Sequence, residues 1–289
     1  MKPFDIASID DLAKLLRVHP HEIASVCHDR DRLYSTFRKR KGTSGIRTLN
    51  VPQGRLKLLQ EKIHSHIFGV VKPLSCVHGG VARRSAITNA RQHIKKEVVF
   101  CLDIADFFPS IDAKRVECIF GALGFRGEAT RTLVRLTVWE NQLPQGAPTS
   151  SGLANLAMTR IDARLQCLAF AHRITYTRFV DDLTFSGSKR LYKLDRLIQR
   201  IIEEEGFTVN PDKLRIMHAG MRQVVTNIVV NRKLNLTREH RKEIRRLVLT
   251  SARRGGDRSI DTSIAGRVSW LKSVNPHLGT KLHQIVHHA

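Results

Sequence analysis

The sequence predicts an α+β fold, because two strand signals lie among amphipathic helical segments. Residues 98–104 form an almost continuous apolar run, which suits a buried strand. Residues 176–187 contain two short strand-like runs separated by two residues, the length of a tight hairpin turn. This mixed order of helices and strands, without a repeat or a low-complexity segment, indicates an α+β protein.

The first third of the chain is expected to hold two helices and a hairpin. Apolar residues recur at helix-like intervals over 8–30 and again over 53–71, which predicts a helix in each segment. Residues 37–52 place basic residues around a Gly/Ser turn, and we expect a hairpin with a cationic arm there. Residues 72–95 are expected to be irregular.

The remaining elements are expected to be mostly helical. They are helices over 113–142, 150–170 and 191–205, a loop marked by Pro144, Gly146 and Pro148, short strands within 207–235, and a helix that Thr237 caps and that runs to about Arg254.

The charge of the chain points to a polyanionic partner. Its 289 residues include 49 Lys and Arg against 26 Asp and Glu, a formal net charge of +23. Nucleic acid is the first candidate for such a surface and a membrane surface is the second, and charge alone does not decide between them. No apolar run approaches the length of a transmembrane helix, so we expect no membrane span.

The expected compartment is the cytoplasm. The first residues mix acids with apolar side chains and contain no signal-peptide core. The five cysteines are dispersed and none lie at CxxC spacing, which favours free thiols in a reducing compartment over a disulfide framework or a zinc site.

Three aspartates are the strongest candidates for chemistry. Asp181 and Asp182 occupy the predicted hairpin tip, where adjacent carboxylates repel each other unless they are solvated or hold a divalent cation. Asp103 ends the apolar run, where a lone acid is costly to bury. Together they supply what a site of two Mg²⁺ ions for phosphoryl transfer needs, although an Asp pair on its own is more often solvated surface.

Two further features fit a nucleotide site. The loop around Gln145 and Gly146 enters a helix and could hold a nucleotide close to the backbone, or it could be a plain helix-entry turn. Arg47 and the basic run 38–41 could meet a triphosphate, or they could be solvated charges.

These residues resemble a known family, the reverse transcriptases, over about two-thirds of the chain. The matching motifs, in the family's order and spacing, are FCLDIADFFPSI (100–111), LPQGAPTSSGLANLAM (143–158), YTRFVDDL (176–183), GFTVNPDKLRI (206–216) and VVTNIVVN (224–231). The combination is highly specific. It implies a right-hand polymerase fold with fingers and N-terminal helices over 1–94, a palm over 95–231, built as an antiparallel sheet packed on helices, and a helical thumb over 232–289.

The resemblance implies a role for each matching residue. Asp103, Asp181 and Asp182 match the metal-binding aspartates. Phe108 matches the steric gate that rejects a ribose 2′-hydroxyl. The remaining matches are Gln145 and Gly146 beside the incoming nucleotide, Lys213 as the lysine that protonates the pyrophosphate leaving group, and Arg47 as the fingers residue that grips the triphosphate.

Within that family the chain is most similar to the retron reverse transcriptases of bacteria. Asn89, Ala90 and His93 in SAITNARQH (85–93) match their first signature, and Val225-Thr226 match the start of the second. Both signatures are expected to contact RNA. Two positions depart from the family pattern: Asn227 replaces the usual Gly, and Val180 replaces the common Ala before the aspartate pair. Asn tolerates a left-handed backbone, so the turn at Asn227 is expected to survive.

The retron resemblance also implies partners. Similar enzymes copy one structured noncoding RNA encoded beside them and prime synthesis from the 2′-hydroxyl of a guanosine in that RNA. They use deoxynucleoside triphosphates, and the product is branched RNA–DNA, known as msDNA. Such systems usually include an effector protein and act against phage. A higher oligomer is possible, and no membrane partner is expected.

The thumb carries its own charge signal. Residues 232–258 contain ten Lys and Arg and three acids. Four of these cations lie to one side of the apolar stripe of the predicted helix, a pattern that can follow RNA phosphates or can be an ordinary solvated face. They are Arg238, Arg241, Lys242 and Arg245.

Two alternative functions remain open at this point. A reverse transcriptase of another lineage, of group II intron, diversity-generating or abortive-infection type, would share the polymerase motifs and lack a neighbouring noncoding RNA gene. A catalytically inactive polymerase fold that only binds RNA would be expected to have lost at least one metal carboxylate, and all three are present.

Overall fold

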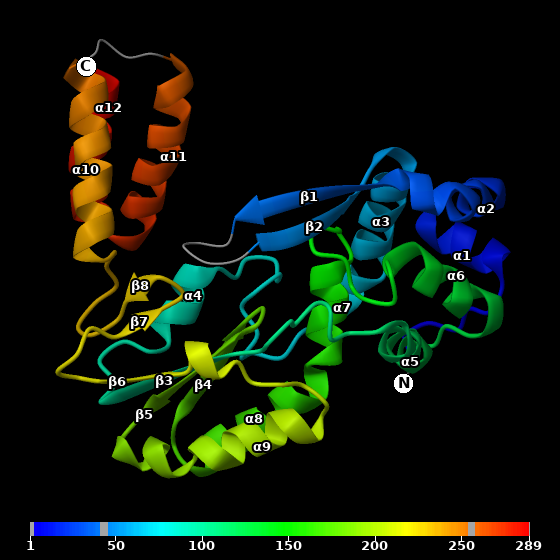
Figure 1. Cartoon of the computed structure of the whole chain (residues 1–289), viewed down its shortest axis with the longest axis horizontal. Coiled ribbons are helices and arrows are strands. Elements are labelled where there is room, and N and C mark those ends of the chain that lie inside the picture. The colour runs from blue at the N-terminus through cyan, green and yellow to red at the C-terminus, as the bar shows by residue number, and fades with distance from the viewer. Residues whose placement is uncertain (1–2, 41–45, 254–257, 289) are drawn as a thin grey trace. The chain divides into compact units, whose positions relative to one another are not determined.

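The computed structural model describes residues 3–40, 46–253 and 258–288 (Figure 1). The chain forms two compact units that alternate along the sequence. The first unit comprises Met1–Gly80, Ile104–Arg164 and Ile201–Val209, and the second comprises Val81–Asp103, Leu165–Arg200 and Asn210–Ala289. The three-part division into fingers, palm and thumb stays a prediction.

The first unit is mostly helical. Its elements are α1 (Ile9–Leu16), α2 (Pro20–Asp29), η1 (Arg30–Leu33), β1 (Tyr34–Arg40), β2 (Ile46–Pro52), α3 (Gly54–His66), η2 (Phe68–Val70), α5 (Ala113–Leu123), α6 (Gly127–Thr137) and α7 (Ser150–Ala157). Strands β1 and β2 pair antiparallel, which confirms the predicted hairpin. The Gly/Ser turn expected between them lies outside the described residues.

The single helix expected over residues 8–30 is in fact two helices. Helix α1 ends where Arg17 adopts a left-handed backbone with φ 54°. Helix α2 then begins with Pro20 in its first turn. Proline disfavours a helical conformation in the residue before it and lacks the N–H that a continuing helix needs, so the apolar periodicity runs through a real break.

The second unit is built on a sheet of four antiparallel strands in the order β4-β5-β3-β6. Its elements are α4 (Ala86–Arg91), β3 (Val98–Asp103), β4 (Thr175–Phe179), β5 (Asp182–Gly187), η3 (Lys189–Lys193), η4 (Pro211–Lys213), β6 (Arg215–His218), β7 (Val224–Val225), β8 (Ile228–Val229), α10 (Arg238–Arg253), α11 (Arg258–Val274) and α12 (Pro276–His288). Helices α8 (Thr159–Ala171) and α9 (Asp195–Glu204) each contribute to both units.

Strand β3 is buried along its whole length, as its apolar sequence predicts. It pairs with β5 on one side and β6 on the other, with Asp103 directly opposite Asp182. The short helix α4 lies in the segment expected to be irregular. A capping box begins this helix. The Ser85 hydroxyl accepts a hydrogen bond from the backbone of Thr88, and the Thr88 hydroxyl accepts one from the backbone of Ser85.

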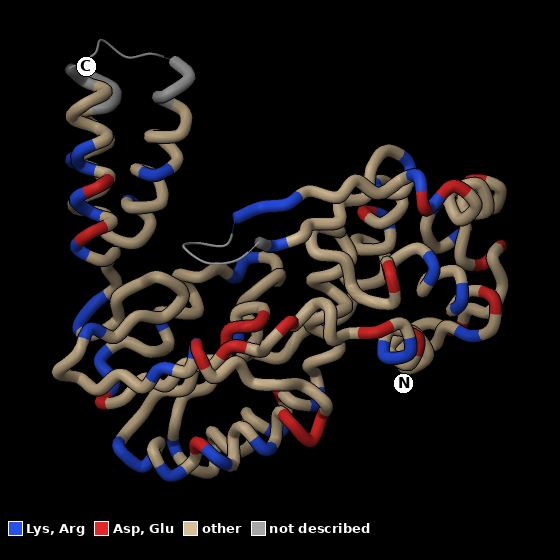
Figure 2. Tube along the Cα trace, viewed as in Figure 1, with Lys and Arg blue, Asp and Glu red and all other residues tan. Residues whose placement is uncertain are grey.

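Helices α10, α11 and α12 pack together as a bundle, and their buried residues, which include Ile244, Val268 and Leu282, belong to an apolar cluster that also contains Val99 of β3 and Val225 of β7. Thr237 caps α10 as predicted, because its hydroxyl accepts a hydrogen bond from the backbone of His240. Basic segments follow one another along α10, interrupted by acidic ones (Figure 2).

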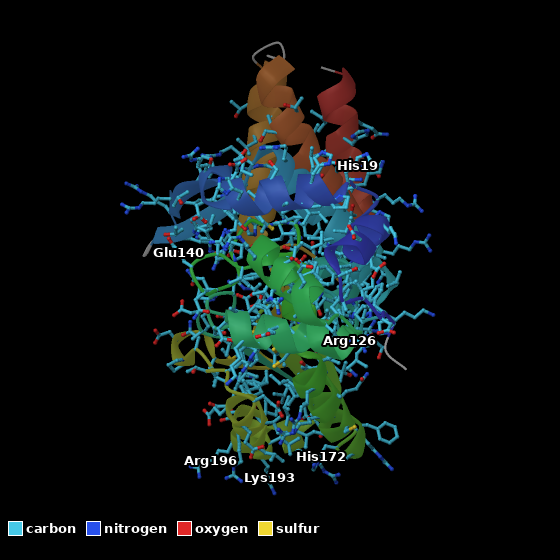
Figure 3. The ribbon with its side chains drawn as sticks, turned by 90° about the vertical axis from the view of Figure 1, so that its right-hand side faces the viewer. His19, Arg126, Glu140, His172, Lys193 and Arg196 are labelled. Carbon is cyan, nitrogen blue, oxygen red and sulfur yellow. The ribbon has the colours of Figure 1, made fainter. Side chains whose placement is uncertain are left out.

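Cations also mark the surface of the second unit near α9. Lys193 of η3 and Arg196 of α9 are exposed and project away from the ribbon (Figure 3). Among the described helices, none is both long and apolar enough to cross a bilayer.

Candidate active site

Three carboxylates meet at one end of the four-stranded sheet. Asp103 ends β3, Asp182 begins β5, and Asp181 lies in the turn that joins β4 to β5. A ligand oxygen from each of the three lies within 4.8 Å of the other two. The structure therefore brings the three aspartates together as predicted, and all of them belong to the second unit.

The turn that carries Asp181 has an unusual backbone. Val180 has φ 61°, a left-handed conformation that is rare for a β-branched residue. Its carbonyl accepts a hydrogen bond of 2.8 Å from Arg178, whose side chain is fully buried. A buried guanidinium that holds this carbonyl helps to keep the strained turn in place.

The site concentrates three acidic groups in a small volume. Burial, and after it the neighbouring charges of Asp181 and Asp103, together raise the pKa of Asp182 to about 7. Asp103 is 5% exposed, and a carboxylate so deeply buried is costly unless it has a partner. That partner is Lys213, whose Nζ lies 2.6 Å from Asp103 Oδ1.

Lys213 reaches the site from the short helix η4. The side chain of Asn210 accepts a hydrogen bond from the backbone of Asp212 and so caps this turn. The backbone N–H of Asn210 in turn donates to the carbonyl of Asp103 at 2.8 Å. The loop that presents the lysine is thus fastened to the strand that presents the carboxylate.

The donor set suits a hard divalent cation. Three carboxylates provide only oxygen ligands, which Mg²⁺ and Mn²⁺ prefer to softer donors. Burial and the charges of Asp181 and Asp103 raise the pKa of Asp182, and a bound cation would favour its ionised form. Asp103, Asp181 and Asp182 are therefore the residues that would hold a metal.

The residues expected at the nucleotide all lie in the first unit. Phe108 is half-buried, with its ring 5.4 Å from that of Phe107. The carbonyl of Gln145 accepts a hydrogen bond of 2.9 Å from the backbone of Asn50 on β2. Arg47 on β2 is exposed.

Gly146 has a structural reason to be glycine. Its φ is 109°, and a Cβ atom there would lie 3.0 Å from Val51 Cγ2. Backbone conformation and close approach both exclude a larger residue. The interpretation of this loop as a close backbone approach is consistent with that geometry, while its role towards a nucleotide stays a prediction.

The two retron signatures lie against each other. The Thr226 hydroxyl, in the turn between β7 and β8, donates a hydrogen bond of 3.1 Å to the carbonyl of Ala86 at the start of α4. Thr226 and Asn227 have φ 46° and 64°, so the turn survives the replacement of glycine by Asn227 as expected.

Burial corrects the expected roles of three signature residues. Asn89, His93 and Val225 are each 0% exposed, which leaves them no surface for the direct RNA contact that the resemblance implies. Both polar atoms of the Asn89 amide lack a hydrogen-bond partner among the described residues. Thr226 is half-buried and keeps some accessible surface.

The four thumb cations differ in accessibility. Arg238, Lys242 and Arg245 are exposed along one stripe of α10, whereas Arg241 is half-buried. The Arg241 Nε is buried and has no hydrogen-bond partner within the described part of the chain. The exposed three are the better candidates for phosphate contact.

Sequence reasoning missed two groups of this site. Arg178 was not singled out, although a lone arginine inside the apolar run of the hairpin was a signal that it is held by partners. The hydroxyl partners of His93, which are Thr177 and Ser186, were also missed. Nothing in their spacing from His93 pointed to the contact.

The fold and the carboxylate centre define a polymerase of the right-hand class, and the comparison with family models agrees. Residues 38–251 match the model of "Reverse transcriptase (RNA-dependent DNA polymerase)", so the chain belongs to the reverse transcriptase family. Curated relatives narrow this to the retron type. They include the retron Mx65 reverse transcriptase of Myxococcus xanthus, 35% identical over 88% of this chain, and the retron Ec86 reverse transcriptase of Escherichia coli, 32% identical over 82%.

The relatives differ in how much of their length this chain spans. It covers 76% of the Ec86 protein and 64% of the Mx65 protein, and 46% of the retron Mx162 reverse transcriptase of Myxococcus xanthus. Among solved structures, telomerase from Candida albicans in complex with a fragment of telomeric RNA matches with a TM-score of 0.52. That match has 9% identity and covers 87% of this chain and 56% of the other, so it supports the fold alone.

Proposed function

We propose that the chain is an RNA-directed DNA polymerase that copies a cognate structured noncoding RNA into single-stranded DNA. The observation that carries this proposal is the cluster of Asp103, Asp181 and Asp182, complete and paired with Lys213, in a chain of the reverse transcriptase family. A fold that only binds RNA has no use for three mutually repelling carboxylates.

The proposed chemistry is phosphoryl transfer with two Mg²⁺ ions. When bound, the ions supply charge neutralisation at the attacking and leaving oxygens. The three aspartates would hold the ions. The Lys213 ammonium, 2.6 Å from Asp103, would stabilise charge on the leaving group and give it a proton. Phe108, Gln145, Gly146 and Arg47 would bind the deoxynucleoside triphosphate.

The proposed substrate follows from the retron relatives. We infer that synthesis begins from a 2′-hydroxyl of the cognate RNA and yields branched RNA–DNA. An effector protein would complete an antiphage defence system in the cytoplasm. Support comes from identities of 30–37% to five retron reverse transcriptases.

The test begins with the native locus and its flanking DNA. Nucleic acid that copurifies with the protein is separated on a denaturing gel, with and without RNase. A discrete DNA band that shifts without vanishing on RNase treatment is the expected result, because the DNA is joined to RNA. DNA that is unchanged by RNase, or RNA alone, would reject RNA-primed synthesis.

A variant pair links the product to the carboxylates. Asp181→Asn should remove extension of a primed RNA template while RNA affinity, measured in EDTA, stays unchanged. Asp10→Asn, at an exposed position in the first unit, is the matched control and should extend normally. Extension by the Asp181 variant would reject the metal assignment.

A further inference from the structure

His93 lies at a junction between the retron signature helix and the sheet. It follows α4 closely and is 0% exposed. Its Nδ1 lies 2.6 Å from the Ser186 hydroxyl on β5, and its Nε2 lies 2.7 Å from the Thr177 hydroxyl on β4. One imidazole ring therefore bridges the two strands of the hairpin that carries Asp181 and Asp182.

The His93 ring contacts the face of the β4–β5 hairpin on which the Asp182 side chain lies. Side chains two residues apart on a strand share a face, so Ser186 and Asp182 lie on one face of β5. Asp103 lies directly opposite Asp182 and therefore on that face too. Ser186 is four residues from Asp182, or about 13 Å along the strand.

The hydrogen bonds at His93 constrain geometry because they are buried and two-sided. Ser186 is 0% exposed and Thr177 is 2% exposed, so no bulk water replaces a lost partner. A neutral imidazole donates from one nitrogen and accepts at the other, and each hydroxyl can take the complementary role. Loss of either contact leaves a buried polar atom unpaired, which is costly.

The other side of the same segment is fastened to the second signature. Thr226 donates to the Ala86 carbonyl at one end of α4, and the backbone of Lys95 donates to the Val230 carbonyl at 3.1 Å just beyond His93. Residues 86–95 are thus hydrogen-bonded to the region of β7 and β8 at Ala86 and at Lys95, and to the β4–β5 hairpin through His93.

We propose that His93 is a positioning residue, which sets the β4–β5 hairpin so that Asp181 and Asp182 meet Asp103 in metal-binding geometry. It acts through Ser186 and Thr177 and touches no RNA. The inference rests on the proposed polymerase function and assigns to the first retron signature a task in catalysis. A buried histidine that only fills space would tolerate the loss of both hydroxyls.

The hairpin itself offers a matched set of variants. Thr177→Val and Ser186→Ala each remove one partner of the ring with little change of shape. Thr184→Val is the control: Thr184 is buried on the same face of β5, between Ser186 and Asp182, and its hydroxyl contacts Cys101 Sγ at 3.9 Å instead of the ring. The control lies nearer the carboxylate than Ser186 does, so it reports any general sensitivity of this strand.

Five quantities are measured for each protein: kcat and KM for primed extension, the Kd for Mn²⁺ from the electron paramagnetic resonance of free ion, the Kd for RNA in EDTA, and Tm. Thr177→Val and Ser186→Ala should lower kcat by about 10- to 100-fold, the loss expected for a small misplacement of catalytic groups. They should also weaken Mn²⁺ binding, with KM for nucleotide and RNA affinity within twofold of the parent. Thr184→Val should match the parent in kcat and Mn²⁺ affinity.

His93 itself is tested by substitution and rescue. His93→Phe removes both hydrogen bonds, and His93→Gln restores one donor and one acceptor, so the Gln variant should recover part of the kcat that the Phe variant loses. If His93→Phe does not fold, the two hydroxyl variants carry the test alone.

Two results would overturn the proposal. One is an equal effect of all three hydroxyl variants on kcat and Mn²⁺ affinity. The other is weaker RNA binding with unchanged kcat on bound RNA, which would return His93 to RNA recognition. A parent protein that neither extends a primer nor binds Mn²⁺ would reject the polymerase function itself, whereas an active parent with fully active variants would reject only the positioning role.

Discussion

The carboxylate of Asp182 holds a proton more tightly in the folded protein than in the unfolded chain, because its pKa rises from 3.8 to about 7 on folding. Between about pH 4 and 7 the folded state without metal therefore binds the extra proton, and stability must fall as pH rises. In EDTA, the free energy of unfolding should decrease over this range. Asp182→Asn should remove that part of the decrease and should make the metal-free protein more stable at pH 7. Urea unfolding at several pH values checks this.

Other groups titrate in the same range, so the informative quantity is the difference between parent and variant. Asp195→Asn is the control and should run parallel to the parent, because Asp195 accepts a hydrogen bond from Gln199 and does not belong to the cluster of three carboxylates. Parallel curves for Asp182→Asn as well would mean that folding does not raise the pKa of Asp182.

Phe108 allows a test of sugar selection. If its ring blocks a ribose 2′-hydroxyl, Phe108→Ala should raise the ratio of ribonucleotide to deoxynucleotide incorporation, measured as kcat/KM for each, by an order of magnitude or more. Phe107→Leu is the control, since Phe107 is buried and packs against Phe207. Unchanged discrimination in the Phe108 variant would remove Phe108 from the nucleotide site.

Residue-scale predictions succeeded where a side chain's chemistry is costly in isolation. An acid at the end of an apolar strand and two adjacent acids at a hairpin tip are each costly in isolation, and a shared cation removes that cost. The clustering of Asp103 with Asp181 and Asp182 could therefore be predicted. Asn89 and His93 could not be assigned in the same way. Polar residues in a segment expected to be irregular suggest an exposed position, and only the fold shows that these two are buried.

At the scale of elements, the contact between α11 and α12 depends on one glycine. A Cβ atom on Gly279 would lie 2.2 Å from Lys272 Cα, so the two helix backbones approach too closely for any side chain. Gly279→Ala should destabilise the thumb bundle by about 1–3 kcal/mol, the usual cost of overpacking. Thermal unfolding of the whole protein measures it.

Gly266 on α11 provides the opposite case. A Cβ atom there would meet nothing within 4 Å, and the residue is exposed. Gly266→Ala should therefore stabilise by up to about 1 kcal/mol through helix propensity alone. Equal effects of the two substitutions would contradict the close approach at Gly279.

Element boundaries show what periodicity misses. The hairpin β4–β5 and the buried strand β3 were predicted because alternation and continuous apolar runs extend over whole strands. The break between α1 and α2 was not, since both helices bury apolar residues in phase across it. The decisive signal was Pro20.

At the scale of the whole molecule, the net charge of +23 predicts that exposed cations of α10 contribute to RNA binding. Replacing Arg238, Lys242 and Arg245 by Gln should weaken RNA binding and reduce the slope of log Kd against log salt by about two, if each contacts a phosphate of single-stranded RNA. The measurement is RNA affinity over a salt series in EDTA.

The control for this prediction removes equal charge elsewhere. Lys72, Lys114 and Arg131 are exposed in the first unit. Their replacement by Gln should change the slope less. The same slope in both triple variants would mean that the thumb face holds no special contact and that total charge alone attracts RNA.

The five motifs predicted a polymerase fold, but they did not predict how the chain divides into two compact units. The motifs follow one another in sequence, whereas the structure alternates segments of two units. Contacts such as Ala105 with Thr208, and the Phe107 ring with Phe207, join residues about 100 positions apart, and no local pattern encodes them.

The alternation of the two units has a consequence for synthesis on the ribosome. The first unit includes Ile201–Val209. Synthesis of that segment ends 45 residues after Arg164, the last residue of the unit's preceding segment. At about 5–20 residues per second, the nascent chain waits roughly 2–9 s with the surface around Phe107 uncovered. During that interval it is a natural client for chaperones. For the same reason, no single cut in the chain yields two fragments that each contain a whole unit.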